Sequence, residues 1–338
     1  MSQNTGIQWT DATWNPIRGC SRVSEGCRNC YAEVVAARFS GPGQPYEGLA
    51  RRTSNGGSRW TGKIMFVEKH LADPLRWRTP SRIFVNSMSD LFHEGVTDEQ
   101  LDMIFAVMAL ADRHTFQVLT KRPERQRDYI SAPGLRERIA AAANAIMRAS
   151  KGTRGFDHAL AHRFLWRSCD SIDPGPWANR LSGIADDQWP LPNVWLGVSV
   201  EDQAAANERI PLLLKTPAAV RFLSCEPLIA PVDLIPFLYD EFEGTSMPDF
   251  DSPVASNRGI NWVIIGGESG ANARPCDTRW IRDIVEQCAG AGVAPFVKQL
   301  GAYPVNGSYE MKLEDGHGGN PEEWAPHLRV REFPEVAA

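Results

Sequence analysis

The chain has 338 residues, 43% of them hydrophobic and 23% charged, which are ordinary values for a globular protein. Its net charge of −5 argues against a protein that coats nucleic acid non-specifically, although a local basic patch could still hold a nucleic-acid substrate. The N-terminus is polar and lacks the apolar segment of a signal peptide, and no apolar run is long enough to span a bilayer. The seven cysteines are odd in number and scattered. We therefore expect a cytoplasmic protein in a reducing compartment, without a membrane partner.

The first unit along the chain is predicted to be an extended lead-in, a cysteine loop and a helix. Cys20, Cys27 and Cys30 lie within eleven residues at the spacing C-x6-C-x2-C. Their loop is rich in Ser, Arg, Glu, Gly and Asn, which is not the composition of a core segment. Helical spacing and good helix formers follow from Tyr31 to Phe39.

These three cysteines admit four interpretations. They could be buried core thiols, a zinc site completed by a distant His, or partners in a disulfide. The fourth interpretation is a metal centre with one open coordination position. Structural zinc sites and most electron-transfer clusters have four protein ligands, and here no further cysteine follows until Cys169. An open position predicts chemistry on a bound ligand.

The middle of the chain repeats short apolar runs that each end in a polar cluster. The runs are residues 83–85, 116–119, 194–198, 220–223, 262–265 and 295–297. Amphipathic helices lie between most of them, including one from about Thr97. Continuously apolar strands that alternate with helices predict parallel β/α units. We expect an α/β fold with a partial or full (β/α) barrel of six to seven parallel strands; the alternative is a doubly wound sheet.

Other segments interrupt this rhythm. Residues 40–62 are rich in Gly, Pro, Ser and Arg and predict an irregular loop. An insertion is expected at about 131–190, beginning with an alanine-rich helix at about 135–149. Residues 236–259 predict an acidic loop, and the tail from about 302 shows no clear period. We expect a single barrel domain that carries these additions.

The polar clusters predict one site, because the carboxyl ends of parallel strands meet at one edge of a barrel. They contain Ser87, Ser89, Asp90, Lys121, Ser199, Glu201, Cys225, Glu226, Gly266, Gly267, Glu268 and Lys298. Plainer roles compete: Ser89, Asp90 or Glu201 could cap the next helix, and Cys225 could be a core thiol. Carboxylates at a barrel mouth are stronger candidates for function, which favours Glu226 and Glu268.

A barrel with a three-cysteine loop after its first strand resembles the radical S-adenosylmethionine (radical SAM) superfamily. The C-x2-C pair followed by Tyr31 matches that family's motif, while the first gap is C-x6-C instead of the usual C-x3-C. The loop GC-x6-C-x2-CYAE, with NSMSDLFH, LTKRPE, GVSVE, SCEPL, GGESG and VKQLG, resembles more closely a phage-encoded family with this loop. The resemblance implies a [4Fe–4S] cluster on Cys20, Cys27 and Cys30, with SAM on the fourth iron.

The resemblance also implies roles for other residues. It assigns SAM binding to Tyr31, Ser87, Ser89, Asp90, Lys121, Ser199, Glu201, Gly266, Gly267 and Lys298. It assigns catalysis to Cys225, Glu226 and Glu268, with Cys225 as a hydrogen-atom donor. The implied reaction cleaves SAM to a 5′-deoxyadenosyl radical that abstracts a hydrogen atom, with an electron from a flavodoxin or ferredoxin. The reaction class within the superfamily stays open.

From this resemblance and from one loop, the substrate is expected to be a modified nucleobase in phage DNA or a related nucleotide. Arg51, Arg52 and Arg59 lie beside Trp60 in a glycine-rich loop, which suits phosphate contact and base stacking. A plain surface loop is the alternative. Two other functions remain open: a non-catalytic zinc- or cluster-containing nucleic-acid-binding protein, and a cluster-free barrel hydrolase with Glu226 and Glu268 as an acid/base pair.

Overall fold

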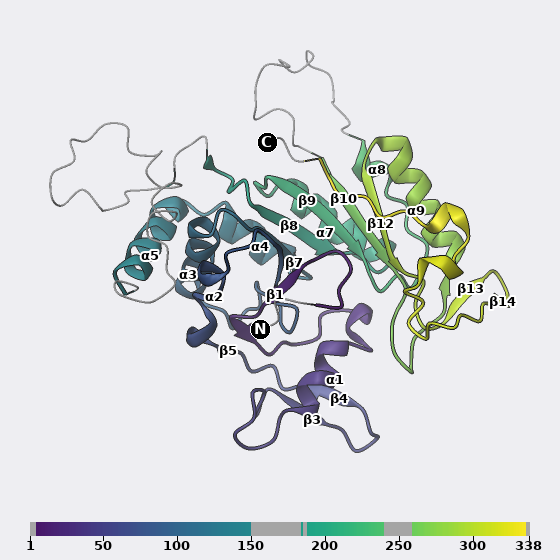
Figure 1. The fold of residues 1–338 in the computed structure, drawn as a ribbon, viewed down its shortest axis with the longest axis horizontal. Helices are drawn as coiled ribbons and strands as arrows, with labels where there is room; N and C mark the ends of the chain where they lie inside the picture. The colour runs from purple at the N-terminus through teal and green to yellow at the C-terminus, as the bar shows by residue number, and fades with distance from the viewer. Residues whose placement is uncertain (1–4, 150–183, 185–187, 240–258, 336–338) are drawn as a thin grey trace, which may run out of the picture.

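The fold is built on one sheet of seven parallel strands, drawn in Figure 1 from a computed structural model that describes residues 5–149, 184, 188–239 and 259–335. The strands, in their order across the sheet, are β1 (Ala12–Trp14), β6 (Arg82–Val85), β7 (Thr115–Thr120), β8 (Val194–Ser199), β9 (Val220–Cys225), β10 (Trp262–Gly266) and β12 (Ala294–Gln299). This order never reverses, whereas a doubly wound sheet reverses at its switch point. The sheet curls into a half-barrel with β1 and β12 at its edges, which confirms the predicted partial (β/α) barrel.

Helices connect the strands along the chain. They are α1 (Tyr31–Arg38), α2 (Asp73–Arg76), α3 (Asp98–Leu110), α4 (Pro123–Ile130), α5 (Leu135–Ala149), α7 (Gln203–Leu214), α8 (Ile235–Leu238) and α9 (Thr278–Ala291). The start of α3 has a local cause: Thr97 accepts a hydrogen bond from the Gln100 backbone, and the Gln100 side chain accepts one from the Thr97 backbone. The helices predicted near residues 31, 97 and 135 are confirmed.

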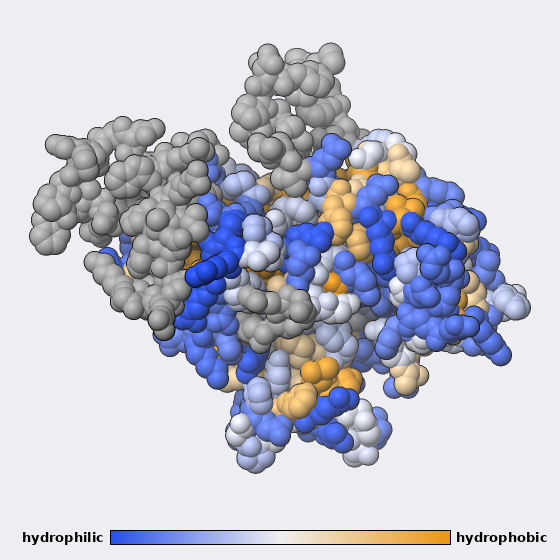
Figure 2. Space-filling model, viewed as in Figure 1, coloured by the Kyte–Doolittle hydropathy of each residue, from blue (hydrophilic) through white to orange (hydrophobic). Residues whose placement is uncertain are grey.

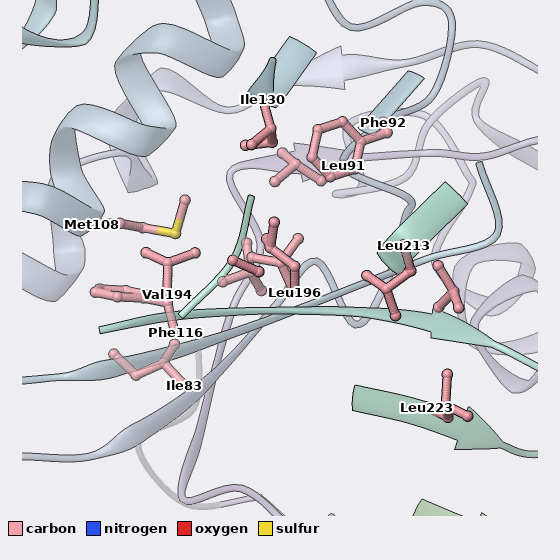
Figure 3. Packing of buried hydrophobic residues seen from close by; sticks show 14 of the residues in the cluster. Ile83, Leu91, Phe92, Met108, Phe116, Ile130, Val194, Leu196, Leu213 and Leu223 are labelled. Atoms are coloured by element: carbon pink, nitrogen blue, oxygen red, sulfur yellow. The ribbon is translucent and has the colours of Figure 1, made fainter. Parts of the chain in front are cut away.

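Alternate residues of the strands face two different cores, because successive side chains in a strand point to opposite faces. The larger core lies between the sheet and its helices and is mainly aliphatic, with Ile83, Leu196 and Leu223 among the strand residues and Met108 and Leu213 from helices (Figure 3).

The second core is aromatic and fills the inner face of the half-barrel. Phe84, Phe222 and Trp262 come from strands, while Trp9 comes from the N-terminal segment. The Trp9 ring centroid lies 4.7 Å from that of Phe84 and 6.1 Å from that of Trp262. Phe333, near the other end of the chain, packs on Trp262 at 5.3 Å. Both ends of the chain therefore close the base of the half-barrel.

Smaller sheets lie outside the half-barrel and were not predicted. The segment expected to be irregular contains a hairpin of β3 (Ala50–Arg52) and β4 (Ser58–Trp60), and the tail contains β13 (Pro304–Asn306) and β14 (Tyr309–Glu310). β13 pairs with β11 (Cys276–Asp277), and β2 (Ile17–Arg18) pairs with β5 (Met65–Phe66). Strands of two or three residues are too short to carry a readable hydrophobic period. Single turns of 3₁₀ helix occur at Glu25–Cys27, Glu68–His70, Pro321–Glu323 and Pro326–Leu328.

Two predicted segments fall largely outside the described ranges. The insertion begins with α5 where expected, but residues 150–183 and 185–187 are not described, nor are residues 240–258 of the acidic loop. Within the described ranges, none of the helices has the length and apolar character needed to cross a bilayer.

Candidate functional site

A cavity of about 560 Å³ lies at the carboxyl ends of the central strands, between the cysteine loop and the aromatic base. Trp9 and Phe84 line it from the aromatic core. The predicted residues that line it are Cys20, Cys27, Cys30, Tyr31, Ser87, Ser89, Asp90, Lys121, Ser199, Glu226, Gly267, Glu268 and Lys298. A cavity of this size is typical of sites for small molecules and cofactors. The fold therefore brings the cysteine loop and the strand ends to one site, as the sequence predicted.

The cysteine loop is shaped by local backbone requirements. It follows Gly19, whose φ is +92° and where a side chain would come within 2.1 Å of the Lys63 carbonyl oxygen, so only glycine fits. Gly19 also forms a β-bridge with Ser89. The 3₁₀ turn Glu25–Cys27 then reverses the loop, and Cys30 is the N-cap residue of α1. All three loop thiols are free and partly exposed.

The electrostatic surroundings of the three thiols differ. Burial, followed by the charge of Asp90, raises the pKa of the Cys20 thiol to about 12, and Arg122 opposes this rise. The Arg122 Nη1 lies 4.0 Å from the Cys20 Sγ. Burial also raises the pKa of Cys30, although backbone N–H groups in the first turn of α1 act in the opposite direction. Cys27 influences the pKa of both other thiols, so the three sulfurs lie within reach of one another's charge.

Across the described ranges, no group of three or more His, Cys, Asp or Glu side chains is arranged so that it could hold a metal ion. A four-iron cluster makes a different demand, because each of its cysteines binds a separate iron and the sulfurs stand farther apart than the ligands of a single ion. All three loop thiols line the cavity, which gives the donor type and number for a cluster with one open iron position.

Hydrogen bonds fasten the cysteine loop to the ends of different strands. They join Ser21 to Arg122 after β7, Ser24 to Glu201 after β8, and Asn29 to Glu268 after β10. The Arg122 Nη2–Ser21 Oγ distance is 2.7 Å, and the Asn29 Nδ2–Glu268 Oε2 distance is 2.9 Å. The loop is thereby held in place on the mouth of the half-barrel.

Glu201 is the most deeply buried of these anchors. It is 1% exposed and accepts hydrogen bonds of 2.8 Å and 3.2 Å from Arg209, while the Lys121 Nζ lies at 3.5 Å. Burial opposes its charge, but Lys121, Arg209 and the Ser24 hydroxyl outweigh burial and lower the pKa of the Glu201 carboxyl to about 2. A side chain at Gly26 would come within 2.9 Å of this carboxyl group. Glu201 is not among the residues that line the cavity, so its contacts are with the protein.

Asp90 lines the cavity, but both of its carboxylate oxygens are engaged. Oδ1 accepts from the Thr120 hydroxyl at 2.6 Å, and Oδ2 accepts from the Lys121 backbone at 3.0 Å and from the Arg122 Nη1 at 3.1 Å. These bonds join the turn after β6 to the end of β7. Asp90 therefore also holds Arg122, which in turn holds the cysteine loop.

The hydroxyl groups beside Asp90 join the N-terminal segment to the end of β6. The Ser89 hydroxyl donates to the Ile17 carbonyl at 2.9 Å, and the Ser87 hydroxyl donates to the Asn15 Oδ1 at 3.2 Å. The Tyr31 hydroxyl donates to the Ser87 carbonyl at 2.7 Å. Both serines and Tyr31 line the cavity while they hold α1 and β1 in place.

Glu226 and Lys298 form a pair that faces the cavity. They follow β9 and lie in β12, their Oε1 and Nζ atoms are 2.5 Å apart, and each side chain is 18% exposed. Within the described part of the chain, Lys298 is the one donor to this carboxylate. A side chain at Gly266 would come within 3.3 Å of Gln299, so this glycine serves packing against β12, and it is not among the residues that line the cavity. Charges of both signs are thus offered to a ligand.

The segment after β10 is packed tightly against the end of β12. A side chain at Gly267 would lie 2.2 Å from the Leu300 carbonyl oxygen, so glycine is required for the close approach to the segment that follows β12. Glu268 accepts from the Arg274 Nη2 at 2.7 Å and Nε at 3.0 Å. Burial opposes the charge of Glu268, but these bonds outweigh it and lower the pKa of its carboxyl.

Cys225 lies apart from the other predicted residues. Its side chain is fully buried in the aliphatic core and is not among the residues that line the cavity. Burial raises the pKa of its thiol. A core thiol was the alternative that the sequence analysis gave to a role of Cys225 as a hydrogen-atom donor.

The polar residues of the site that were not predicted include Asn29, Arg209 and Arg274. Arg209 lies in α7 and is 2% exposed, although an arginine in a helix is usually expected at the surface. Arg274 lies in an irregular segment with no period. The one available signal was the position of Asn29 between Cys27 and Cys30.

This chain belongs to the family described as "Protein of unknown function (DUF5131)", whose model matches residues 4–325. The match covers the cysteine loop and all seven strands of the half-barrel. No curated protein and no solved structure matches the chain.

Proposed function

We propose that this protein is a radical SAM enzyme that holds a [4Fe–4S] cluster on Cys20, Cys27 and Cys30. The observation that supports this most is that three thiols of one loop line the same cavity as the carboxyl ends of the parallel strands. When bound, cluster and SAM would supply reductive cleavage of a carbon–sulfur bond and a radical that removes a hydrogen atom from the substrate. A flavodoxin or ferredoxin would donate the electron, in a reducing, cytoplasmic setting.

The part played by the chain would be to bind and orient. Glu226 and Lys298 suit the amine and carboxylate of SAM, because a zwitterion can satisfy each member of the pair with its own opposite charge. Trp9 and Phe84 offer apolar surface within the same cavity, which suits an adenine ring. The bonds from Arg122, Glu201 and Glu268 would keep the loop in one position, so little rearrangement is needed on binding.

In the hydrolase alternative, Glu268 is unsuited to the role of the acid. Glu268 accepts three hydrogen bonds from the backbone and side chain of Arg274, and its lowered pKa keeps it ionised at neutral pH. An ionised Glu268 cannot donate a proton to a leaving group.

Iron content tests the proposed cluster directly. Protein reconstituted under anaerobic conditions is expected to be brown and to bind about four iron ions per chain. Cys27→Ala should lose iron and colour, whereas the matched variant Cys276→Ala, which removes a thiol outside the loop, should keep both. Colourless protein with about one zinc per chain would favour a nucleic-acid-binding module instead.

Two further measurements address SAM. With dithionite, the iron-loaded protein is expected to form 5′-deoxyadenosine, and its absence from fully loaded protein would overturn the proposal. Titration calorimetry should show SAM binding weakened about tenfold by Glu226→Gln or by Lys298→Met, since each removes a charged hydrogen bond. Glu322→Gln, at an exposed carboxylate, is the matched control and should bind SAM normally.

A further inference from the structure

An arm formed by residues 31–63 projects from the half-barrel (Figure 1). It consists of α1 and the β3–β4 hairpin, which pack on each other. Its five Lys and Arg residues outnumber its two carboxylates, in a chain whose net charge is −5. One of the carboxylates, Glu33, is buried and paired with Arg22, so the cations dominate the surface of the arm.

The cations of the arm have no ionic partner among the residues that the structure describes. Those concerned are Arg38, Arg51, Arg52, Arg59 and Lys63, all exposed, and none forms an ion pair with a described residue. In the barrel, by contrast, Arg122, Arg209 and Arg274 each bind a carboxylate. The arm therefore offers free guanidinium groups, which suit the oxygens of phosphate.

Two of these arginines face each other across the hairpin. Arg51 and Arg59 are directly opposite in the antiparallel pair β3–β4. Like charges in that position destabilise a hairpin. An anion that contacts both side chains would remove this repulsion.

Aromatic and apolar surface lies beside the cations and continues into the cavity. Tyr31 is 51% exposed and Phe39 is 44% exposed, both on α1 or at its end. Figure 2 shows hydrophobic surface bordered by hydrophilic residues over this projecting unit. Trp60 of β4 and Tyr31 also line the cavity. One continuous surface thus runs from the free cations to the candidate active site.

We propose that the arm binds a single-stranded nucleic acid and presents one of its bases to the cavity. Arg51, Arg52 and Arg59 contact phosphates, and Tyr31 and Phe39 stack on bases. A single strand is favoured over a duplex, because a base must leave its stack to enter a pocket. The fate of that base rests on the function proposed above, whereas binding by the arm does not require the cluster.

The test measures fluorescence anisotropy of a labelled single-stranded DNA longer than the roughly 4–16 nucleotides that one binding fold covers. The unaltered chain should bind, with affinity falling as salt rises. Arg51→Ala/Arg52→Ala/Arg59→Ala should weaken binding at least about tenfold and lower the slope of log K against log salt by about 2, since each phosphate contact contributes about 0.7. The matched control Arg78→Ala/Arg148→Ala/Lys215→Ala removes as many exposed cations outside the arm and should bind normally.

A second variant separates stacking from charge. Tyr31→Ala/Phe39→Ala should weaken binding about tenfold and leave the salt slope unchanged. Unlabelled single-stranded RNA and duplex DNA serve as competitors: competition by RNA identifies which single strand is preferred and supports the proposal, while stronger competition by the duplex contradicts it. No binding at low salt, or equal binding by the arm variant and its control, would overturn the proposal and leave the arm to a protein partner.

The two proposals fail separately. Cys27→Ala should still bind the oligonucleotide, because its arm is intact. Oligonucleotide binding without 5′-deoxyadenosine formation would contradict the proposed enzyme activity and support binding by the arm. SAM cleavage without oligonucleotide binding would support the enzyme activity and contradict binding by the arm.

Discussion

Glu201 and Glu226 follow neighbouring strands and contain the same carboxyl group, yet the structure uses them differently. Glu201 is 1% exposed, is surrounded by Arg209, Lys121 and Ser24, and does not line the cavity. Glu226 faces the cavity with Lys298 as its donor. A carboxylate at the carboxyl end of a barrel strand is therefore not a ligand by position alone. Its partners and its access to solvent decide its role.

The cysteine loop causes the difference. Its Gly26 lies against Glu201, and a side chain there would come within 2.9 Å of the carboxyl carbon. The loop thus covers Glu201 and leaves Glu226 open to the cavity. We expect changes on the Glu201 side to act on folding stability, and changes on the Glu226 side to act on ligand binding.

The largest effect is expected for Glu201→Ala. The substitution leaves Arg209, which is 2% exposed, without its counter-charge, and should lower the free energy of unfolding by about 3–5 kcal/mol. Urea denaturation measures this. Glu226→Ala is the matched variant and should cost at most about 1 kcal/mol, because water can reach Lys298. Equal losses in the two variants would contradict the comparison.

The stability of the protein at low pH should also show that Glu201 supports the fold. The pKa of Glu201 falls from an ordinary 4.5 to about 2 in the folded chain, so its contribution to stability is complete above about pH 4.5. That contribution is lost as the pH falls from about 4.5 towards 2, because the unfolded chain then takes up a proton that the folded Glu201 does not bind. The unfolding free energy of the unaltered chain should decline more steeply over this range than that of Glu201→Gln. If the unfolding free energies of the two chains fell in parallel with pH, the contacts of Glu201 would not stabilise its ionised form.

A smaller loss is expected for Gly26→Ala. The added methyl group meets Glu201, and overpacking of this kind costs about 1–3 kcal/mol. Gly316→Ala is the control, since no atom lies within 4 Å of the added group, and it should change stability by less than about 0.5 kcal/mol. Thermal unfolding of both variants measures these changes. If Gly26→Ala had the stability of the unaltered chain, the loop would not pack tightly against Glu201.

The smallest effect is expected on the cavity side of the loop. Tyr31→Phe removes one hydrogen bond, of 2.7 Å to the Ser87 carbonyl, and should cost about 0.5–1.5 kcal/mol. Tyr309→Phe, at a residue that is 74% exposed, should cost nothing measurable by urea denaturation. If Tyr31→Phe lowered the free energy of unfolding as much as Glu201→Ala does, contacts on the cavity side would also contribute strongly to folding stability.

The sequence by itself determined the alternation of strands and helices. Apolar runs such as residues 262–265 and the reciprocal caps of Thr97 and Gln100 are signals read within a few neighbouring residues. It also predicted that Cys20, Cys27 and Cys30 belong together, because their spacing is local. The polar clusters were predicted to meet because parallel strands share one direction.

Only the tertiary structure decided which of those polar residues face the cavity and which hold the loop. Glu201 meets Ser24, which lies far from it in sequence, and Cys225 points into the core while Glu226 beside it faces the cavity. The short hairpin that carries Arg51 and Arg59 was also beyond the reach of periodicity. The physical reason is that ion pairing and solvation depend on groups brought together by folding, and no local pattern records them.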